Sequence, residues 1–283
     1  MKTFLTLTLM AVMVLSASIG ANAAMEIVGM NGKGPVDFGT FVEDIGRSEV
    51  IFIGDTHDDS RIHVKQLEII RALYAGNPQL AIGLEMFTTD SQRYLDNWTA
   101  GKMEEKEFAA IYAKNWSYDW SLYRDLFIFS RDHHIPMIAL NVPKAIIATV
   151  VRLGAMSLSE SDKSELPSDL HWTLSPRQAE YLRRIREQAF GNVPTRIPAA
   201  NFEEAQALRN STFAYNIAMY RRKFPELKVV VIAGTWHAIK NGAPECLKDY
   251  GGSTYKVVLP DLVEFGWLKP TAEDVDYLIP RGD

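Results

Sequence analysis

The chain has 283 residues, with 30 lysines and arginines, 35 aspartates and glutamates, and one cysteine, Cys246. A net charge of −5 argues against nucleic acid as a partner, and a single cysteine excludes an internal disulfide. The length suits one α/β domain with an insertion, and the composition is that of an ordinary globular protein.

The first 23 residues are typical of a secretory signal peptide. Lys2 precedes an apolar core from Leu5 to Leu15, and the small-x-small sequence Ala21-Asn22-Ala23 follows it. The apolar core is too short for a stable transmembrane helix. We therefore expect cleavage after Ala23 and a periplasmic protein, residues 24–283, that forms one domain without a transmembrane segment.

Residues 50–53 give the first strong strand signal. Their bulky apolar side chains, three of them β-branched, predict a strand that is buried on both faces, as in a parallel sheet. Gly54 is expected to permit a tight turn where this strand ends. Further strands are predicted at 80–84, 136–140, 229–233 and 255–259, the last of which should close the sheet.

Helical patterns connect these strands. They cover residues 38–45, 60–75, 89–98, 106–114, 122–132 and 202–224, the last with Asn201 as its N-cap. This alternation predicts an α/β fold with a mostly parallel central sheet flanked by helices. Between about residues 142 and 200 the strand signal disappears, and Ser175-Pro176 predicts the start of a helix. We interpret this region as a helical insertion that acts as a lid.

Polar residues follow the predicted strands directly, and ligands of parallel sheets bind at the carboxyl ends of strands. The residues expected to share that edge are Asp55, His57, Glu85, Asn141 and His237. His57 and His237 each end a Gly-x-x-His sequence. By contrast, His133 and His134 precede a strand, so they should lie at the opposite edge.

Asp55, His57, Glu85 and His237 are the candidate catalytic residues. Two imidazoles with two carboxylates can hold a divalent metal, and the alternative is a set of helix-capping and hydrogen-bonding groups. His63 could reach the same edge from the first helical turn. The aromatic residues between Trp98 and Trp120 predict either core packing or contact with a planar apolar ligand.

Several short motifs, taken in order, resemble the ChaN-like family of iron-regulated haem-binding proteins. The motifs are Gly54-Asp55-Thr56-His57-Asp58 with His63, Gly83-Leu84-Glu85-Met86-Phe87, Asp119 with Tyr123, Ile135 to Asn141, Glu204-Ala205-Gln206 and Gly234-Thr235-Trp236-His237. That family shares a superfamily with the Tiki proteases and the TraB and PrgY proteins. For ChaN, the resemblance implies an α/β fold with a helical insertion and a dimer that encloses cofacial haems held by tyrosine and histidine.

The Tiki branch implies instead a metal site formed by His57, Glu85 and His237. Two residues depart from the family pattern: Asp55 replaces a glutamate in the first motif, and Asn210 stands where an aspartate is expected after Gln206. No motif places the haem tyrosine, so position alone selects Tyr181 and Tyr215, with His63 as a further cofactor-binding candidate.

We therefore expect an exported haem- or iron-binding protein that acts in haem or iron uptake, with a haem donor or receptor as its partner. The alternative is a metal-dependent hydrolase in which a divalent ion activates a bound water. A third interpretation is an interaction protein that keeps the scaffold without the chemistry.

Overall fold

The computed structural model describes residues 27–32, 34–191, 196–261 and 270–280. The strands are β1 (Ile27–Gly29), β2 (Gly34–Val36), β3 (Val50–Asp55), β4 (Leu80–Thr88), β5 (Met137–Asn141), β6 (Lys228–Gly234), β7 (Tyr255–Pro260) and β8 (Tyr277–Ile279). They form one sheet in the order β2-β1-β8-β7-β3-β6-β4-β5.

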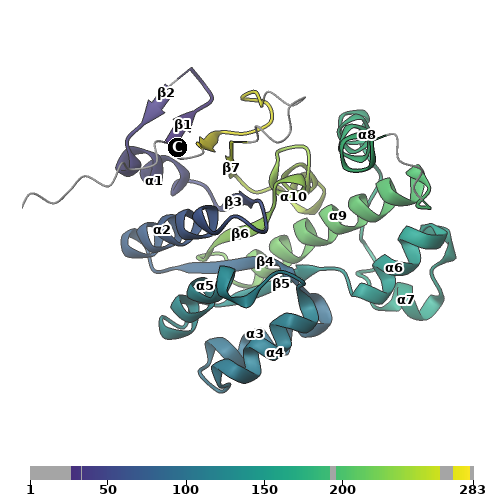
Figure 1. Ribbon diagram of the computed structural model, residues 1–283, viewed down its shortest axis with the longest axis horizontal. Coiled ribbons are helices and arrows are strands. Elements are labelled where there is room, and N and C mark those ends of the chain that lie inside the picture. Colours follow the sequence, from purple (N-terminus) through teal and green to yellow (C-terminus); the bar gives the residue numbers. More distant parts are fainter. Residues whose placement is uncertain (1–26, 33, 192–195, 262–269, 281–283) are drawn as a thin grey trace, which may run out of the picture.

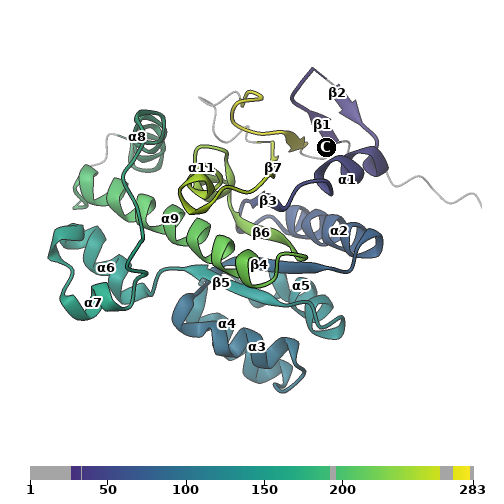
Figure 2. The same cartoon turned by 180° about the vertical axis from the view of Figure 1, so that it is seen from behind.

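Helices surround this sheet (Figures 1 and 2). They are α1 (Phe38–Ile45), α2 (Ser60–Gly76), α3 (Gln92–Thr99), α4 (Glu105–Asn115), α5 (Trp120–Asp132), α6 (Lys144–Leu153), α7 (Glu160–Ser164), α8 (Pro176–Phe190), α9 (Ala199–Lys223), α10 (Thr235–Ala238) and α11 (Ala243–Cys246). From β8 to β5 neighbouring strands are parallel, and only β1 pairs antiparallel, with β2 and β8. The predicted α/β class with a mostly parallel sheet is confirmed.

The central strand β3 is buried on both faces, which explains its uninterrupted apolar sequence. Val50 and Phe52 pack against the α9 side of the sheet, whereas Ile51 and Ile53 pack against the α2 side. Burying each such side chain contributes roughly 1.5–3 kcal/mol. The strand that carries the first Gly-x-x-His sequence is therefore a rigid support for the residues at its end.

Gly54 does not end this strand, contrary to the prediction from sequence. Strand β3 continues to Asp55, which pairs in register with Gly234 of β6. A Cβ atom on Gly54 would lie 2.6 Å from Leu259 Cδ2 on β7. The glycine thus leaves space for the side chain of Leu259 on the neighbouring strand, and no turn occurs at this position.

The end of β4 and the position of β7 in the sheet also differ from prediction. Strand β4 runs on to Thr88, so Glu85 lies inside it, where the pairing with β5 shifts register between Leu84 and Thr88. Such irregularities re-aim side chains. Strand β7 does not close the sheet, because it lies between β3 and β8, and β8 has too few residues to give a strand signal in the sequence.

The predicted insertion is helical: α6, α7 and α8 gather at one end of the molecule, beside the start of α9 (Figures 1 and 2). Ser175 caps α8 through a capping box, with Pro176 at its first position, as predicted. Helix α9 begins at Ala199, after Pro198, so Asn201 lies within it and is not its N-cap.

Across the described ranges, the structure contains no helix with the length and apolarity needed to cross a membrane. The predicted signal peptide, residues 1–23, lies outside the described residues.

Candidate functional site

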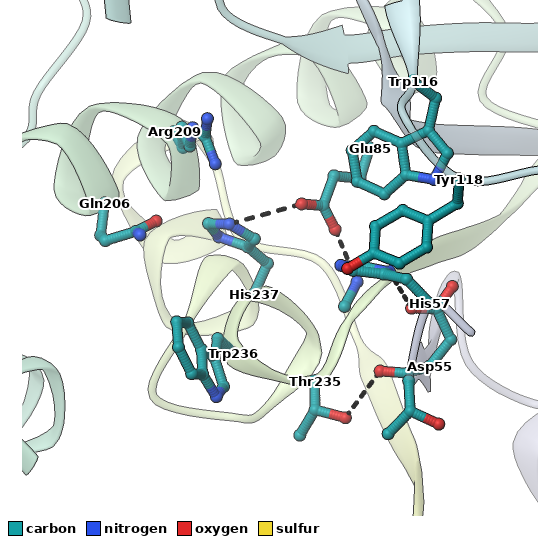
Figure 3. Close-up of a pocket in the computed structure, with 12 residues that line it drawn as sticks. Asp55, His57, Glu85, Trp116, Tyr118, Gln206, Arg209, Thr235, Trp236 and His237 are labelled. Carbon is teal, nitrogen blue, oxygen red and sulfur yellow. Dashed lines mark hydrogen bonds and ion pairs between the residues drawn. The ribbon is translucent and has the colours of Figure 1, made fainter. Parts of the chain in front are cut away.

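A pocket of about 380 Å³ opens at the carboxyl ends of β3, β4 and β6 (Figure 3). It is lined by Asp55, Thr56, His57, Glu85, Trp116, Tyr118, Gln206, Arg209, Gly234, Thr235, Trp236 and His237. Strand polarity had placed four of these residues at a common edge. His133 and His134 are exposed and do not line this pocket. Their Nδ1 atoms donate hydrogen bonds to the carbonyl oxygens of Phe129 and Thr99, respectively.

At the end of β3, the buried carboxylate of Asp55 holds the ring of His57. His57 Nδ1 lies 2.6 Å from Asp55 Oδ1, and the hydroxyl of Tyr123 on α5 donates to Asp55 Oδ2 at 3.0 Å. Burial lowers the pKa of His57, but the attraction of Asp55 and, more weakly, of Glu85 and Asp58 outweighs it and raises that pKa to about 9. His57 is therefore a cation at neutral pH.

At the end of β6, His237 is held by a neutral partner. Its Nδ1 donates to Asn210 Oδ1 on α9 at 2.7 Å, and both side chains are buried. Burial, together with the nearby cations of Arg209 and His57, lowers the pKa of His237 to about 4, although Glu85 opposes this shift. His237 is therefore neutral at neutral pH.

Glu85 lies between these two histidines. Its Oε2 accepts a hydrogen bond from the backbone N–H of Gly234 at 2.5 Å, and its Oε1 lies 3.6 Å from His237 Nε2. A Cβ atom on Gly234 would lie 2.7 Å from His57 Cε1 and 3.4 Å from Glu85 Oε2. Glycine at this position lets the imidazole and the carboxylate approach the strand end.

The aromatic wall of the pocket comes from the connection between α4 and α5. The ring centroids of Trp116 and Tyr118 lie 4.8 Å and 4.9 Å from that of His57. The sequence had left core packing and ligand contact open for this aromatic stretch, and the structure places part of it in the core and part of it in the lining of the pocket. Trp98 and Phe108 are buried in the core, whereas Tyr118 keeps 38% of its surface exposed.

Helix α9 contributes Gln206 and Arg209 to the lining of the pocket (Figure 3). Asn210, on the same helix, contacts His237. The spacing of Gln206 and Asn210 suggested from sequence that both could face the site. Arg209 was not foreseen, because an arginine inside a long helix is usually a solvated side chain.

One family description, the haem-binding uptake family ChaN of the Tiki superfamily, matches residues 41–247. The match covers well over half of the 283 residues. The chain belongs to the ChaN family. The resemblance drawn from the short motifs is thereby confirmed.

Two solved structures share the ChaN fold. ChaN of Campylobacter jejuni, described with cofacial haem binding, superposes with a TM-score of 0.72 over 92% of this chain and 98% of its own, at 16% identity. The type III effector HopBA1 superposes with a TM-score of 0.50 over 93% of this chain and 99% of its own, at 13% identity. At these identities the likeness shows the fold alone.

One curated plant protein is also related to this ChaN-family chain. Protein RETICULATA-RELATED 5, chloroplastic, of Arabidopsis thaliana is 29% identical over 131 residues. The match covers 43% of this chain but 17% of the plant protein. The chain therefore spans less than a fifth of that relative.

The three cofactor-binding candidates chosen from sequence do not line the pocket of this ChaN-family protein. His63 lies beneath it, where its Nε2 donates to the carbonyl oxygen of His57 at 3.2 Å and its ring packs on Tyr123. Tyr181 is buried in the core, with its hydroxyl 3.4 Å from the carbonyl oxygen of Trp236. Tyr215 packs edge-on against Tyr250. Tyr118 is the tyrosine that lines the pocket.

His57, Glu85 and His237, the residue set proposed for a metal, all line the pocket. Within the described residues, no group of three or more His, Cys, Asp or Glu side chains could hold an ion.

The insertion borders a second cavity and not the pocket itself. This cavity of about 290 Å³ shares Glu85, Trp116 and Arg209 with the pocket. Its other lining residues are Met86, Thr88, Asn115, Asn141, Val142, Lys144, Ile147, Ala148 and Val151. Helix α6 of the insertion therefore lines a cavity next to the pocket.

Proposed function

We propose that this chain binds haem in the pocket at the carboxyl ends of β3, β4 and β6 and acts in haem or iron uptake after export to the periplasm. The observation that carries the proposal is Tyr118, an exposed tyrosine at the wall of an aromatic pocket in a chain of the haem-binding ChaN family. Tyrosine and histidine are both axial ligands of haem iron in proteins.

Tyr118 fits that role better than either histidine of the pocket. His57 is held by the carboxylate of Asp55, which raises its pKa to about 9, so it would have to release a proton before it could bind iron. His237 is neutral, but its ring is buried between Asn210 and Glu85. The hydroxyl of Tyr118 makes no hydrogen bond within the described part of the chain, so it is available to a ligand.

The walls of the pocket suit a flat apolar ligand. Trp116 and Tyr118 supply one aromatic side, and Trp236 lies across the pocket from them (Figure 3). Haem supplies an iron centre with an open axial position when it is bound. Because the pocket is open to solvent beside Tyr118, we propose that a second copy of the chain covers the exposed haem face, as the cofacial binding described for ChaN of Campylobacter jejuni suggests.

Titration of the apoprotein with haemin tests the proposal, with the Soret band as the readout. The wild type should bind saturably, and Tyr118→Phe should weaken binding by about tenfold or more, which corresponds to about 1.4 kcal/mol for the lost ligand. Tyr215→Phe is the matched control, because Tyr215 lies outside the pocket. This variant should bind haemin as the wild type does. A loss of haemin affinity in Tyr215→Phe would instead indicate that Tyr215 is the iron ligand.

The metal-dependent hydrolase remains the alternative outcome of the same experiment. It would be supported if haemin showed no saturable binding while the purified protein retained a stoichiometric divalent metal. His57→Ala and His237→Ala should then both abolish the metal content.

A further inference from the structure

Arg209 is a cation without a partner in the wall of the pocket. Within the described residues its side chain makes no hydrogen bond and no ion pair, and its buried Nε finds no acceptor. Glu85, whose charge acts on it, stays outside ion-pair distance. Burial lowers the pKa of Arg209, but a guanidinium keeps its charge in proteins.

The two carboxylates of the pocket have their direct contacts elsewhere. Asp55 is neutralised by His57 and also accepts from Tyr123. Glu85 accepts from the backbone of Gly234. Within the described chain no carboxylate lies at ion-pair distance from Arg209, and Glu85 acts on it only from farther away, although buried charges without a direct partner are strongly unfavourable. A ligand that brings an anion would supply the missing partner.

The position of Arg209 separates it from the proposed iron ligand. In Figure 3, Arg209 and Gln206 lie on one side of Glu85, and Trp116 and Tyr118 lie on the other. Arg209 also borders the second cavity. A ligand that reaches from Tyr118 to Arg209 must therefore be wide, with a negative group at its edge.

We propose that Arg209 binds a carboxylate of the ligand and that, for haem, this carboxylate is a propionate. The planar guanidinium holds a carboxylate through two parallel hydrogen bonds. The inference rests on the proposed function for the identity of the ligand, but the carboxylate contact and the iron contact use different residues. Each can therefore fail alone.

Three porphyrins separate the two contacts. Haemin has both iron and carboxylates, protoporphyrin IX has carboxylates without iron, and haemin dimethyl ester has iron without free carboxylates. Arg209→Gln should weaken haemin and protoporphyrin IX by about tenfold or more and leave the ester unchanged, and Arg209→Lys should restore part of the loss. Tyr118→Phe should show the reverse pattern, weakening haemin and its ester and sparing protoporphyrin IX.

Arg209→Gln also tests the inference in the absence of any ligand. Removal of an unpaired cation should leave the thermal midpoint of Arg209→Gln apoprotein at or above that of the wild type. Arg152→Gln, an exposed arginine on α6, is the matched control and should change neither property.

The inference is overturned if Arg209→Gln weakens all three porphyrins equally or weakens none of them. A lower thermal midpoint would also overturn it, because Arg209 would then be structural. If the wild type binds protoporphyrin IX through Arg209 but shows no iron-dependent gain with haemin, the carboxylate site stands and the haem proposal fails. If no porphyrin binds, both fail.

Discussion

The two Gly-x-x-His sequences end neighbouring parallel strands and face one pocket, yet one histidine is a cation at neutral pH and the other is neutral. The pKa of His57 is raised to about 9, and that of His237 is lowered to about 4. Burial lowers the pKa of both rings, but His57 has the carboxylate of Asp55 to reverse that shift, whereas His237 has an amide partner and lies near the cations of Arg209 and His57. A shared motif places a histidine at a strand end, but the residue that contacts the ring sets its charge.

This contrast also explains what each side of the pocket offers. The β3 side is an ion pair braced by Tyr123, whereas the β6 side is a neutral ring between Asn210 and Glu85. The unpaired cation of Arg209 stands beside the neutral ring and contributes to its low pKa. The α9 side of the pocket is thus the part whose charge favours the binding of an anion.

Asp55→Asn should have the largest effect on stability, because it leaves His57 without its counter-ion. Breaking a buried pair by removing one partner costs about 3–5 kcal/mol, and part exposure of His57 puts the expected loss in unfolding free energy at the lower end of that range. Urea unfolding at pH 7 measures it. Tyr123→Phe, which removes one hydrogen bond to the same carboxylate and leaves the ion pair in place, should cost less, about 1.5–3 kcal/mol.

A pH series of the Asp55→Asn apoprotein provides the check on this explanation. The pKa of His57 is raised in the folded state, so its stabilisation is present below pH 6.5 and is lost as the pH rises through about 9. The variant should lack that alkaline loss. An unchanged alkaline profile would show that the pair does not stabilise the fold.

Acid should destabilise the protein through His237. Its pKa is lower in the folded state than the ordinary value of 6.5, so the unfolded chain binds more protons and stability falls as the pH drops from 6.5 towards about 4. The loss amounts to at most about 3 kcal/mol. Chemical unfolding at pH 7, 5.5 and 4.5 measures this slope.

His237→Gln is the control for the acid series, because it removes the titrating ring while a polar side chain remains beside Asn210. It should flatten the slope over this window. An equally steep acid loss in the variant would assign the effect to other groups.

Asn210→Asp should convert the β6 side into a copy of the β3 side. A carboxylate within hydrogen-bond distance of His237 Nδ1 should raise the pKa of that ring by about one to three units. NMR titration of the imidazole protons measures the shift. Asn201→Asp, on the same helix but in contact with Val151, should leave the pKa of His237 unchanged.

The sequence predicted the part of the site that follows from strand polarity. Asp55, His57, Glu85 and His237 meet because parallel strands carry their ends to a common edge. The irregular pairing that contains Glu85 could not be predicted, since it depends on how β4 and β5 pair.

The other walls of the pocket depend on packing between distant segments. Tyr118 lies in the connection between α4 and α5, and Arg209 lies within α9, so neither follows a strand end. Their positions are set by how those helices pack on the sheet. Local sequence patterns carry no information about that packing. Position alone therefore selected Tyr181 and Tyr215, which do not line the pocket, and passed over Tyr118, which does.

The most direct test of the account is the location of iron in crystals of the haemin-loaded protein, measured by anomalous scattering at the iron absorption edge. The account predicts one iron peak per chain in the pocket, bonded to the hydroxyl oxygen of Tyr118, with a propionate on Arg209. An iron peak beside Tyr181 or Tyr215, or on any surface outside the pocket, would contradict it.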